Sequence, residues 1–200
     1  MKSFKDLYEE LITQTKDLSV DVVEYDSCPV DKALLFDKFE INYDTVYRFV
    51  NSRQQSSEHQ SESERSDFGG YTLFYSINQK AKALIVIKSV IIDEHDELNF
   101  AWKYLSLIHE VGHFNDFKLK KHINSDTLTT DHLQSEIFAE IHVLNYLKKY
   151  GDPLNKCAIS LYCQRLLEWN KTVNCFKFKV SQALINKFTR KRMVKWAKSE

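Results

Sequence analysis

The 200-residue chain is poor in residues that form tight turns, with only 4 glycines and 2 prolines. A chain built from many short strands needs more of them, so this composition favours a largely helical protein. No stretch approaches 18 consecutive apolar residues, and we therefore expect no membrane-spanning helix and no membrane partner. The first 20 residues carry charges in every turn and lack the apolar run of a signal peptide, which predicts a cytoplasmic protein.

Cysteine pairs at the spacing of redox or metal motifs are also missing. None of the four cysteines takes part in a C-x-x-C motif; they are Cys28, Cys157, Cys163 and Cys175. Because cytoplasmic thiols stay reduced, we expect four structural cysteines, most of them buried.

The rest of the composition is typical of one globular domain, with 43% hydrophobic and 28% charged residues. The net charge is zero but unevenly distributed. Residues 1–70 contain 8 Lys/Arg against 15 Asp/Glu (−7), residues 71–150 contain 9 against 10 (−1), and residues 151–200 contain 11 against 3 (+8). Either the acidic N-terminal part packs against the basic C-terminal part, or the basic part binds an acidic partner.

Hydrophobic periodicity predicts where helices and strands lie. Apolar residues at helical spacing (Phe4, Leu7 and Leu11) predict a first helix, and the valine-rich segment 19–25 predicts a short strand. Segment 68–92, "FGGYTLFYSINQKAKALIVIKSVII", predicts strands with a turn at residues 78–80. Further helices are expected within 30–55, at about 98–121, at about 132–150 and, as one basic amphipathic helix, at 180–200.

One segment, "NSRQQSSEHQSESERSD" at residues 51–67, contains no apolar side chain, so we expect a mobile surface loop there. The expected fold class is α+β, with a small mixed or antiparallel sheet packed on a buried helix. Residues 1–150 would form one domain, and residues 151–200 a basic helical C-terminal extension packed on or adjoining it.

The strongest motif is "HEVGH" at residues 109–113, a His-Glu-x-x-His pattern inside an expected helix. On a helix, His109 and His113 lie one turn apart on the same face, close enough to bind one metal ion. Glu110 lies beside them, where it can take a proton from water. Gly112 weakens a helix, which indicates that another backbone or a substrate comes close. The alternative is that both histidines are core residues satisfied by their neighbours.

A catalytic zinc ion needs three protein ligands and an open position. A third histidine six residues after the second is excluded, because Leu119 stands there. The next expected helix offers Glu136 and Glu140, and we favour Glu136 because a helix N-terminus attracts a carboxylate. Glu140 is either an alternative ligand or an acceptor for the N–H of a ligand imidazole. The remaining ligand candidates are His122, His132 and His142.

With these elements placed, the chain resembles the ImmA/IrrE family of zinc metallopeptidases. The matching motifs are "HEVGH", against the family's H-E-x-G-H, and "EIFAE" at residues 136–140, against its E-x-x-A-D-like helix. The order of a Gly-initiated hairpin, an "IVI" strand and the active-site helix also matches, over roughly residues 68–150. The chain departs from the family at Glu140, where Asp or Asn is usual, and at Phe138, where Glu is common.

The resemblance implies a zincin-like fold and a zinc-dependent endopeptidase, a hydrolase that cleaves one specific intracellular protein such as a transcriptional repressor. Zinc on His109, His113 and Glu136 would lower the pKa of a bound water, with Glu110 as the general base. We expect a substrate strand to add to a sheet edge near "KALIVIK", residues 82–88. The candidates for a further donor to the oxyanion are His132, His142, Tyr146 and Tyr150.

Two rival functions stay open. The first is a non-proteolytic regulatory or binding protein with a structural or degenerate zinc site; an intact Glu110 argues against it, because a structural site needs no base. The second is nucleic-acid binding by residues 151–200, whose basic residues accompany Phe176, Phe178 and Trp196. No recognised nucleic-acid motif supports it, and a charged helix is usually a solvated surface.

Overall fold

The computed structural model describes most of the chain outside one long central segment: residues 2–25, 69–77, 80–91, 96–124, 129–149, 152–171 and 175–198. Several predictions lie outside these ranges. They are the helices expected within residues 30–55, the polar loop at 51–67, the turn residues 78–79, Cys28 and Tyr150.

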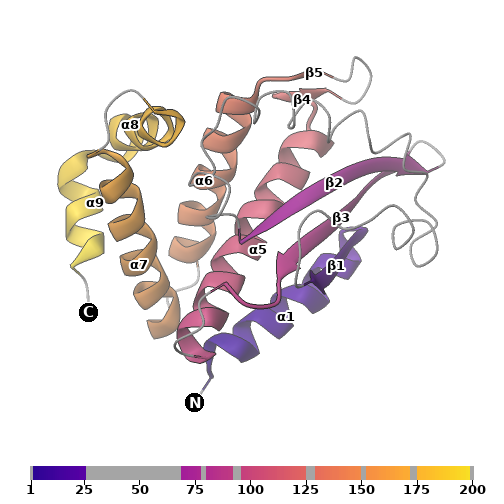
Figure 1. Cartoon of the computed structure of the whole chain (residues 1–200), viewed down its shortest axis with the longest axis horizontal. Coiled ribbons are helices and arrows are strands. Elements are labelled where there is room, and N and C mark those ends of the chain that lie inside the picture. Colours follow the sequence, from indigo (N-terminus) through magenta and orange to yellow (C-terminus); the bar gives the residue numbers. More distant parts are fainter. Residues whose placement is uncertain are drawn as a thin grey trace.

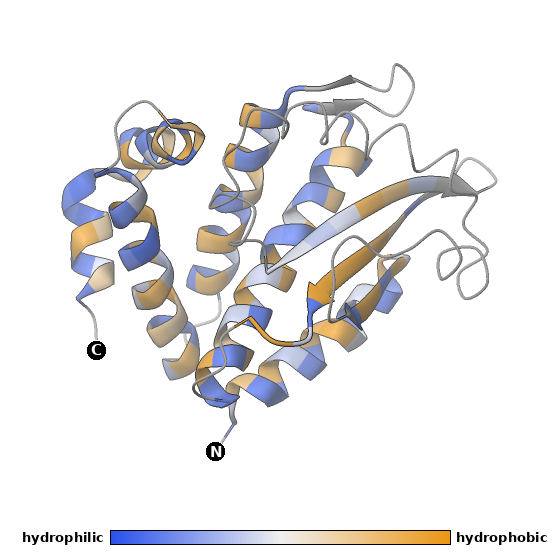
Figure 2. Cartoon of the chain, viewed as in Figure 1, coloured by the Kyte–Doolittle hydropathy of each residue, from blue (hydrophilic) through white to orange (hydrophobic). Residues whose placement is uncertain are grey.

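Three strands form a mixed sheet in the order β1-β3-β2. Strand β1 (Val20–Tyr25) runs parallel to β3 (Lys80–Lys88), and β2 (Gly70–Ile77) runs antiparallel to it. The "ALIVI" run of β3 is fully buried and hydrophobic (Figure 2), because it lies between two strands and against a helix. The predicted α+β class and mixed sheet are confirmed.

The central place of β3 corrects one prediction. We expected a substrate strand to add near "KALIVIK", but β3 is paired along both sides, with Val22 opposite Ile85 on one side and Thr72 opposite the same residue on the other. Its backbone donors and acceptors are therefore already used. Within the part of the sheet that the structure describes, the outer strands are β1 and β2.

Helix α5 (Asp96–Lys118) is the centre of the molecule (Figure 1). It packs against β2 and β3, against α1 (Phe4–Asp17) and against α6 (His132–Lys149). This explains its unusual pattern: apolar residues surround nearly the whole helix because neighbours cover most of its sides. Helix α1 begins at a capping box in which Ser3 and Asp6 satisfy each other's backbone N–H groups.

Helices α5 and α6 approach each other closely at Gly112. A Cβ atom added at Gly112 would lie 2.8 Å from Cα of Ala139 and 3.1 Å from Cβ of His142. The predicted close approach of another backbone is thus confirmed, and the backbone is that of α6. The connection between the two helices contains a short pair of strands, β4 (Ile123–Asn124) and β5 (Thr129–Thr130). Helix α6 follows Asp131, whose Oδ1 accepts a hydrogen bond from the backbone N–H of Gln134.

Beyond α6, three helices stack on the side away from the sheet (Figure 1): α7 (Pro153–Trp169), α8 (Phe176–Phe188) and α9 (Arg190–Ala197). The single helix predicted at 180–200 is wrong. The chain breaks at Thr189, whose φ of 66° no helix accommodates, and the Thr189 hydroxyl instead caps α9 by accepting from the Arg192 N–H.

One hydrophobic cluster includes residues from the three-stranded sheet and from all the helices named above, from Phe4 of α1 to Met193 of α9. The predicted division at residue 150 stays a prediction. None of the helices in the described residues is long and apolar enough to cross a membrane.

Candidate metal centre

The "HEVGH" motif lies in the middle of α5, on the surface that faces α6 and β2. His113 and Glu110 are buried, with exposed fractions of 2% and 4%, and His109 is half-buried. Three polar side chains within two helical turns of a core helix are costly unless partners satisfy them. The contacts of these side chains therefore define the site.

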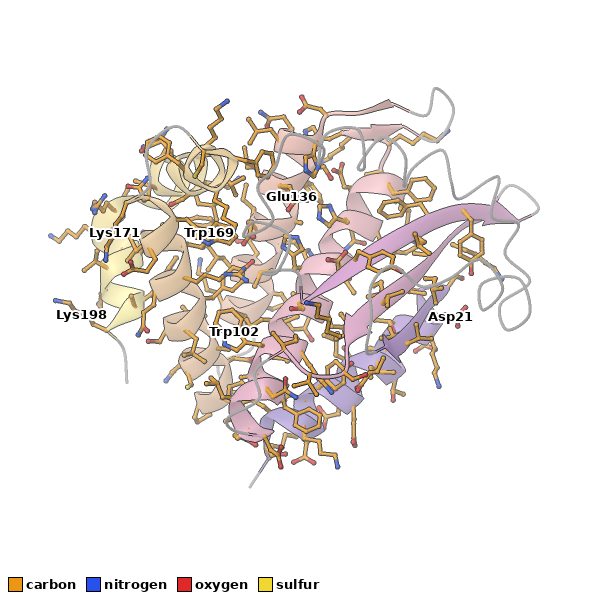
Figure 3. The ribbon with its side chains drawn as sticks, in the orientation of Figure 1. Asp21, Trp102, Glu136, Trp169, Lys171 and Lys198 are labelled. Carbon is orange, nitrogen blue, oxygen red and sulfur yellow. The ribbon has the colours of Figure 1, made fainter. Side chains whose placement is uncertain are left out.

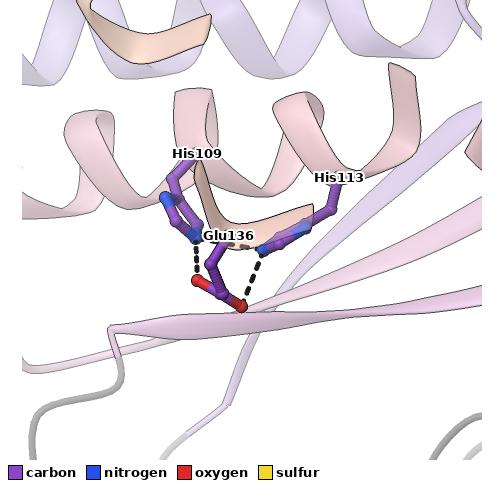
Figure 4. A group of neighbouring side chains, drawn as sticks. All are labelled: His109, His113 and Glu136. Carbon is purple, nitrogen blue, oxygen red and sulfur yellow. Dashed lines mark hydrogen bonds and ion pairs between the residues drawn. The ribbon is translucent and has the colours of Figure 1, made fainter. Parts of the chain in front are cut away.

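Glu136 on α6 reaches both histidines (Figure 4). Its Oε2 lies 3.3 Å from Nε2 of His109, and its Oε1 lies 3.2 Å from Nε2 of His113. The two Nε2 atoms are 3.1 Å apart. The structure therefore brings together the three residues that the sequence analysis chose as ligands, from two helices that meet side by side.

The separation of the two Nε2 atoms is close to that in a tetrahedral metal site, and Glu136 faces the two histidines with different oxygens. Zinc–nitrogen bonds of about 2.0–2.1 Å at tetrahedral angles place neighbouring ligand atoms roughly 3.3–3.4 Å apart. The donor set of two imidazoles and one carboxylate is also one that catalytic zinc uses. The same separations suit hydrogen bonds among the three groups, so a proton and a metal ion compete for one place.

A different group lies next to the Nδ1 atom of each histidine. Nδ1 of His113 forms a hydrogen bond with Oγ of Ser135 at 3.0 Å, whereas Nδ1 of His109 lies at an ion-pair distance of 3.4 Å from Oε1 of Glu140, without a hydrogen bond. An acceptor at Nδ1 keeps the proton there and turns Nε2 toward a metal ion. Of the two roles considered for Glu140, its position behind His109 fits the non-ligand role better, as an ion-pair partner of Nδ1.

Glu140 belongs to a buried network that also involves α7. It is only 1% exposed, the hydroxyl of Tyr162 donates to its Oε2, and Nη2 of Arg165 lies 3.6 Å from its Oε1. The burial of Tyr162 and the charge of Glu140 both raise the pKa of the phenol, so Tyr162 remains a donor. The network keeps the Glu140 carboxylate in place on the far side of His109.

Electrostatic effects within the cluster favour a cation. Burial opposes protonation of His109, but Glu140 and Glu136 outweigh it and raise the pKa of His109 to about 9. Burial would raise the pKa of Glu136, yet His113 and His109 hold that pKa well below its usual value. The Glu136 carboxylate thus stays ionised between two imidazoles in a largely buried place. A bound dication would satisfy the same negative charge that otherwise draws a proton onto His109.

Glu110 points to the sheet side of the helix and borders a cavity. The hydroxyl of Thr72 on β2 donates to Oε2 of Glu110, at 2.5 Å. Gly69 and Gly70 at the start of β2 line the same cavity, together with Glu110, His109 and Glu136. The missing side chain of Gly70 lets β2 lie close to Glu110 and Ile87, since a Cβ there would be 3.6 Å from Cγ of Glu110 and 2.7 Å from Cδ1 of Ile87.

The remaining candidate site residues differ in whether they line the cavity. His132 lines the cavity, with its Nδ1 3.8 Å from Oε1 of Glu136 and its ring stacked on Phe176. His142 and Tyr146 pack against each other, and neither is among the described residues that line the cavity. Burial, together with nearby His109, lowers the pKa of His142 to about 4. His122 pairs with Asp116, its Nδ1 3.2 Å from Oδ1. Of the oxyanion candidates that the structure describes, only His132 is suitably placed.

Sequence reasoning missed four residues of this site. They are Thr72, Ser135, Tyr162 and Arg165. Ser135 directly precedes Glu136, so its position was open to prediction. The other three come from elements far away in the sequence, and only tertiary packing brings them to the site. Arg165 is one of two cations in α7, with Lys156, so the sequence alone does not distinguish it.

Comparisons with known protein families, with curated proteins and with solved structures give no match.

Proposed function

We propose that this protein is a zinc-dependent endopeptidase with a zincin-like arrangement of sheet and active-site helix. The observation that carries the proposal is the convergence of His109, His113 and Glu136, with ligand atoms that all lie within 4.8 Å of one another, beside a buried Glu110 that is not one of the three. A structural site needs no such neighbouring carboxylate, whereas hydrolysis needs a base.

Each residue of the site would have a separate role in hydrolysis. When bound, zinc would lower the pKa of a water molecule toward neutrality. Glu110 would accept the proton of that water and later donate it to the nitrogen of the leaving amine. The hydrogen bond from Thr72 occupies Oε2 of Glu110, which fixes the carboxylate and leaves Oε1 for proton transfer. His132 would donate a hydrogen bond to the oxyanion.

The substrate would bind along β2, in place of the β3 edge expected from the sequence. Strand β2 is an outer strand of the described sheet, and it begins at the two glycines that border the cavity. A peptide paired with β2 would pass directly over Glu110. The protein substrate is intracellular under this proposal, with a transcriptional repressor as the class that the resemblance suggests.

Cleavage by purified protein tests this proposal. The zinc-loaded chain is incubated with a mixture of random-sequence peptides, and new amino termini are identified by mass spectrometry. We expect defined cleavage products from wild type and none from Glu110→Gln, which should keep the fold and the metal. Equal cleavage by both proteins would remove Glu110 from the mechanism. An absence of products at full zinc occupancy would favour a non-proteolytic role.

A further inference from the structure

Helices α7 and α8 supply part of the cavity wall, although nothing in the motif analysis linked them to the metal site. The residues that they contribute are Arg165, Trp169, Phe176, Lys177 and Val180. The site is therefore incomplete without the C-terminal helices. A cavity wall formed by residues outside the ligand set is where an enzyme distinguishes one substrate from another.

Arg165 is the most tightly positioned cation of this wall. The central carbon of its guanidinium lies 4.5 Å from the ring centre of Tyr162, 4.8 Å from that of Trp169 and 5.1 Å from that of Trp102. Trp102 comes from α5 and Trp169 from α7, on the side of α7 toward α6 (Figure 3). Three aromatic rings stabilise the cation and hold the plane of the guanidinium.

This guanidinium has donors to spare. Its Nη2 is 3.6 Å from Oε1 of Glu140, too far for a hydrogen bond, and its Nε is buried without a hydrogen-bond partner among the described residues. A guanidinium carries five N–H donors, and leaving them unused in a largely buried place is costly. A rigid planar fork with unused donors is suited to a planar anion.

We propose that Arg165 binds a carboxylate of the substrate and so makes the enzyme selective for an acidic group close to the scissile bond. This inference rests on the proposed peptidase function and names its substrate class. The carboxylate belongs either to an Asp or Glu side chain or to the C-terminus of a peptide. A phosphate group is a poorer fit, because its second negative charge would meet Glu110, Glu136 and Glu140 in the same cavity.

The contacts also limit how far the acidic group lies from the bond that is cut. Only the Glu140 carboxylate and the His109 ring separate Arg165 from the ligand atoms, across gaps of 3.6 Å and 3.4 Å. An extended peptide advances about 3.3 Å per residue, so a carboxylate that reaches Arg165 belongs to a residue within roughly three positions of the scissile bond.

A set of four hydroxamate probes tests this inference by binding, without any need for turnover. Each probe carries a hydroxamate for the zinc, followed by two residues. The first residue is Glu or Gln, and the C-terminus is a free acid or an amide. Binding to the zinc-loaded protein is followed by tryptophan fluorescence, since Trp102 and Trp169 flank Arg165.

We expect wild type to bind a probe with the preferred carboxylate at least about 10-fold more tightly than its uncharged counterpart. The Glu/Gln pair and the acid/amide pair show which carboxylate is used. Arg165→Gln should abolish the preference while zinc content stays unchanged. Arg165→Lys keeps the charge without the planar fork and should weaken the preference for the charged probe several-fold. It is the test variant if Arg165→Gln does not fold.

Arg192→Gln is the matched control, because Arg192 lies 6.0 Å from the Trp196 ring centre but does not line the cavity. It should keep the full preference. Equal binding of all four probes to wild type, with zinc required for each, would overturn the role of Arg165 and leave the peptidase proposal standing. Failure of every probe to bind the zinc-loaded protein would overturn both.

Discussion

The helix pair α5–α6 and the helix pair α7–α8 contribute to the same cavity in different ways. The first pair supplies the candidate metal ligands at positions that local spacing determines: two histidines one turn apart and a glutamate on the following helix. The second pair supplies side chains that reach the site only through packing, such as Arg165 and Trp169. The candidate metal ligands thus follow from local sequence, whereas the rest of the cavity wall follows from the tertiary fold.

The largest effect on zinc affinity is expected at the proposed ligands on helices α5 and α6. Glu136→Ala should lower the zinc affinity at least about 100-fold, because one of three protein ligands is lost. Competition with a chromogenic chelator measures this affinity. Glu168→Ala is the matched control, since Glu168 is an exposed residue of α7 that pairs with Lys171, and it should leave the affinity unchanged. Equal affinity in Glu136→Ala and wild type would exclude Glu136 as a ligand.

A smaller effect should appear where the two pairs meet, at Glu140. Glu140→Gln keeps the shape of the side chain but removes the charge that His109, Tyr162 and Arg165 share. We expect the zinc affinity to fall about 10- to 100-fold, because the acceptor behind a ligand imidazole becomes weaker. The same chelator competition measures it. A loss as large as that of Glu136→Ala would mean that Glu140 is itself a ligand.

The contact between α5 and α6 gives the smallest of these effects, and it concerns stability rather than metal. Gly112→Ala gains about 1 kcal/mol of helix propensity but places a methyl group against Cα of Ala139, and overpacking costs about 1–3 kcal/mol. We expect a net decrease of about 1 kcal/mol in the free energy of unfolding, measured by urea denaturation.

Asn145→Ala, on the exposed side of α6, serves as the control for that measurement. It lacks any such contact and should leave the protein equally stable or slightly more stable. If Gly112→Ala stabilised the protein as well, the two helices would not be in close contact at this point.

Sequence patterns were informative wherever neighbours along the chain determine the structure. The spacing of His109 and His113 and the close approach at Gly112 were predicted from local sequence, and the structure contains both. The break at Thr189 was missed, because the apolar spacing continues across it. The central place of β3 was missed for another reason: strand order depends on how distant segments pair, and a buried "ALIVI" run predicts burial without naming its neighbours.

The same limit applies to the candidate site. Glu136 could be chosen over Glu140 from helix position, but the role of Glu140 behind His109 required knowledge of which imidazole nitrogen it faces. Thr72 precedes His109 by 37 residues, and Tyr162 and Arg165 follow Glu140 by 22 and 25 residues on another helix. No periodicity connects them to the motif residues. Only the packing of β2 and α7 against α5 and α6 reveals them.

X-ray absorption spectroscopy at the zinc edge, on the zinc-loaded wild-type protein, tests the central claim most directly. The account predicts one tightly held zinc ion with nitrogen and oxygen ligands at about 2.0–2.2 Å, and with the scattering pattern of two imidazole rings. A spectrum that contained sulfur ligands or no imidazole, or a protein that retained no zinc, would contradict it. The "HEVGH" helix would then be a core helix whose histidines are satisfied by Glu136, Ser135 and Glu140 alone.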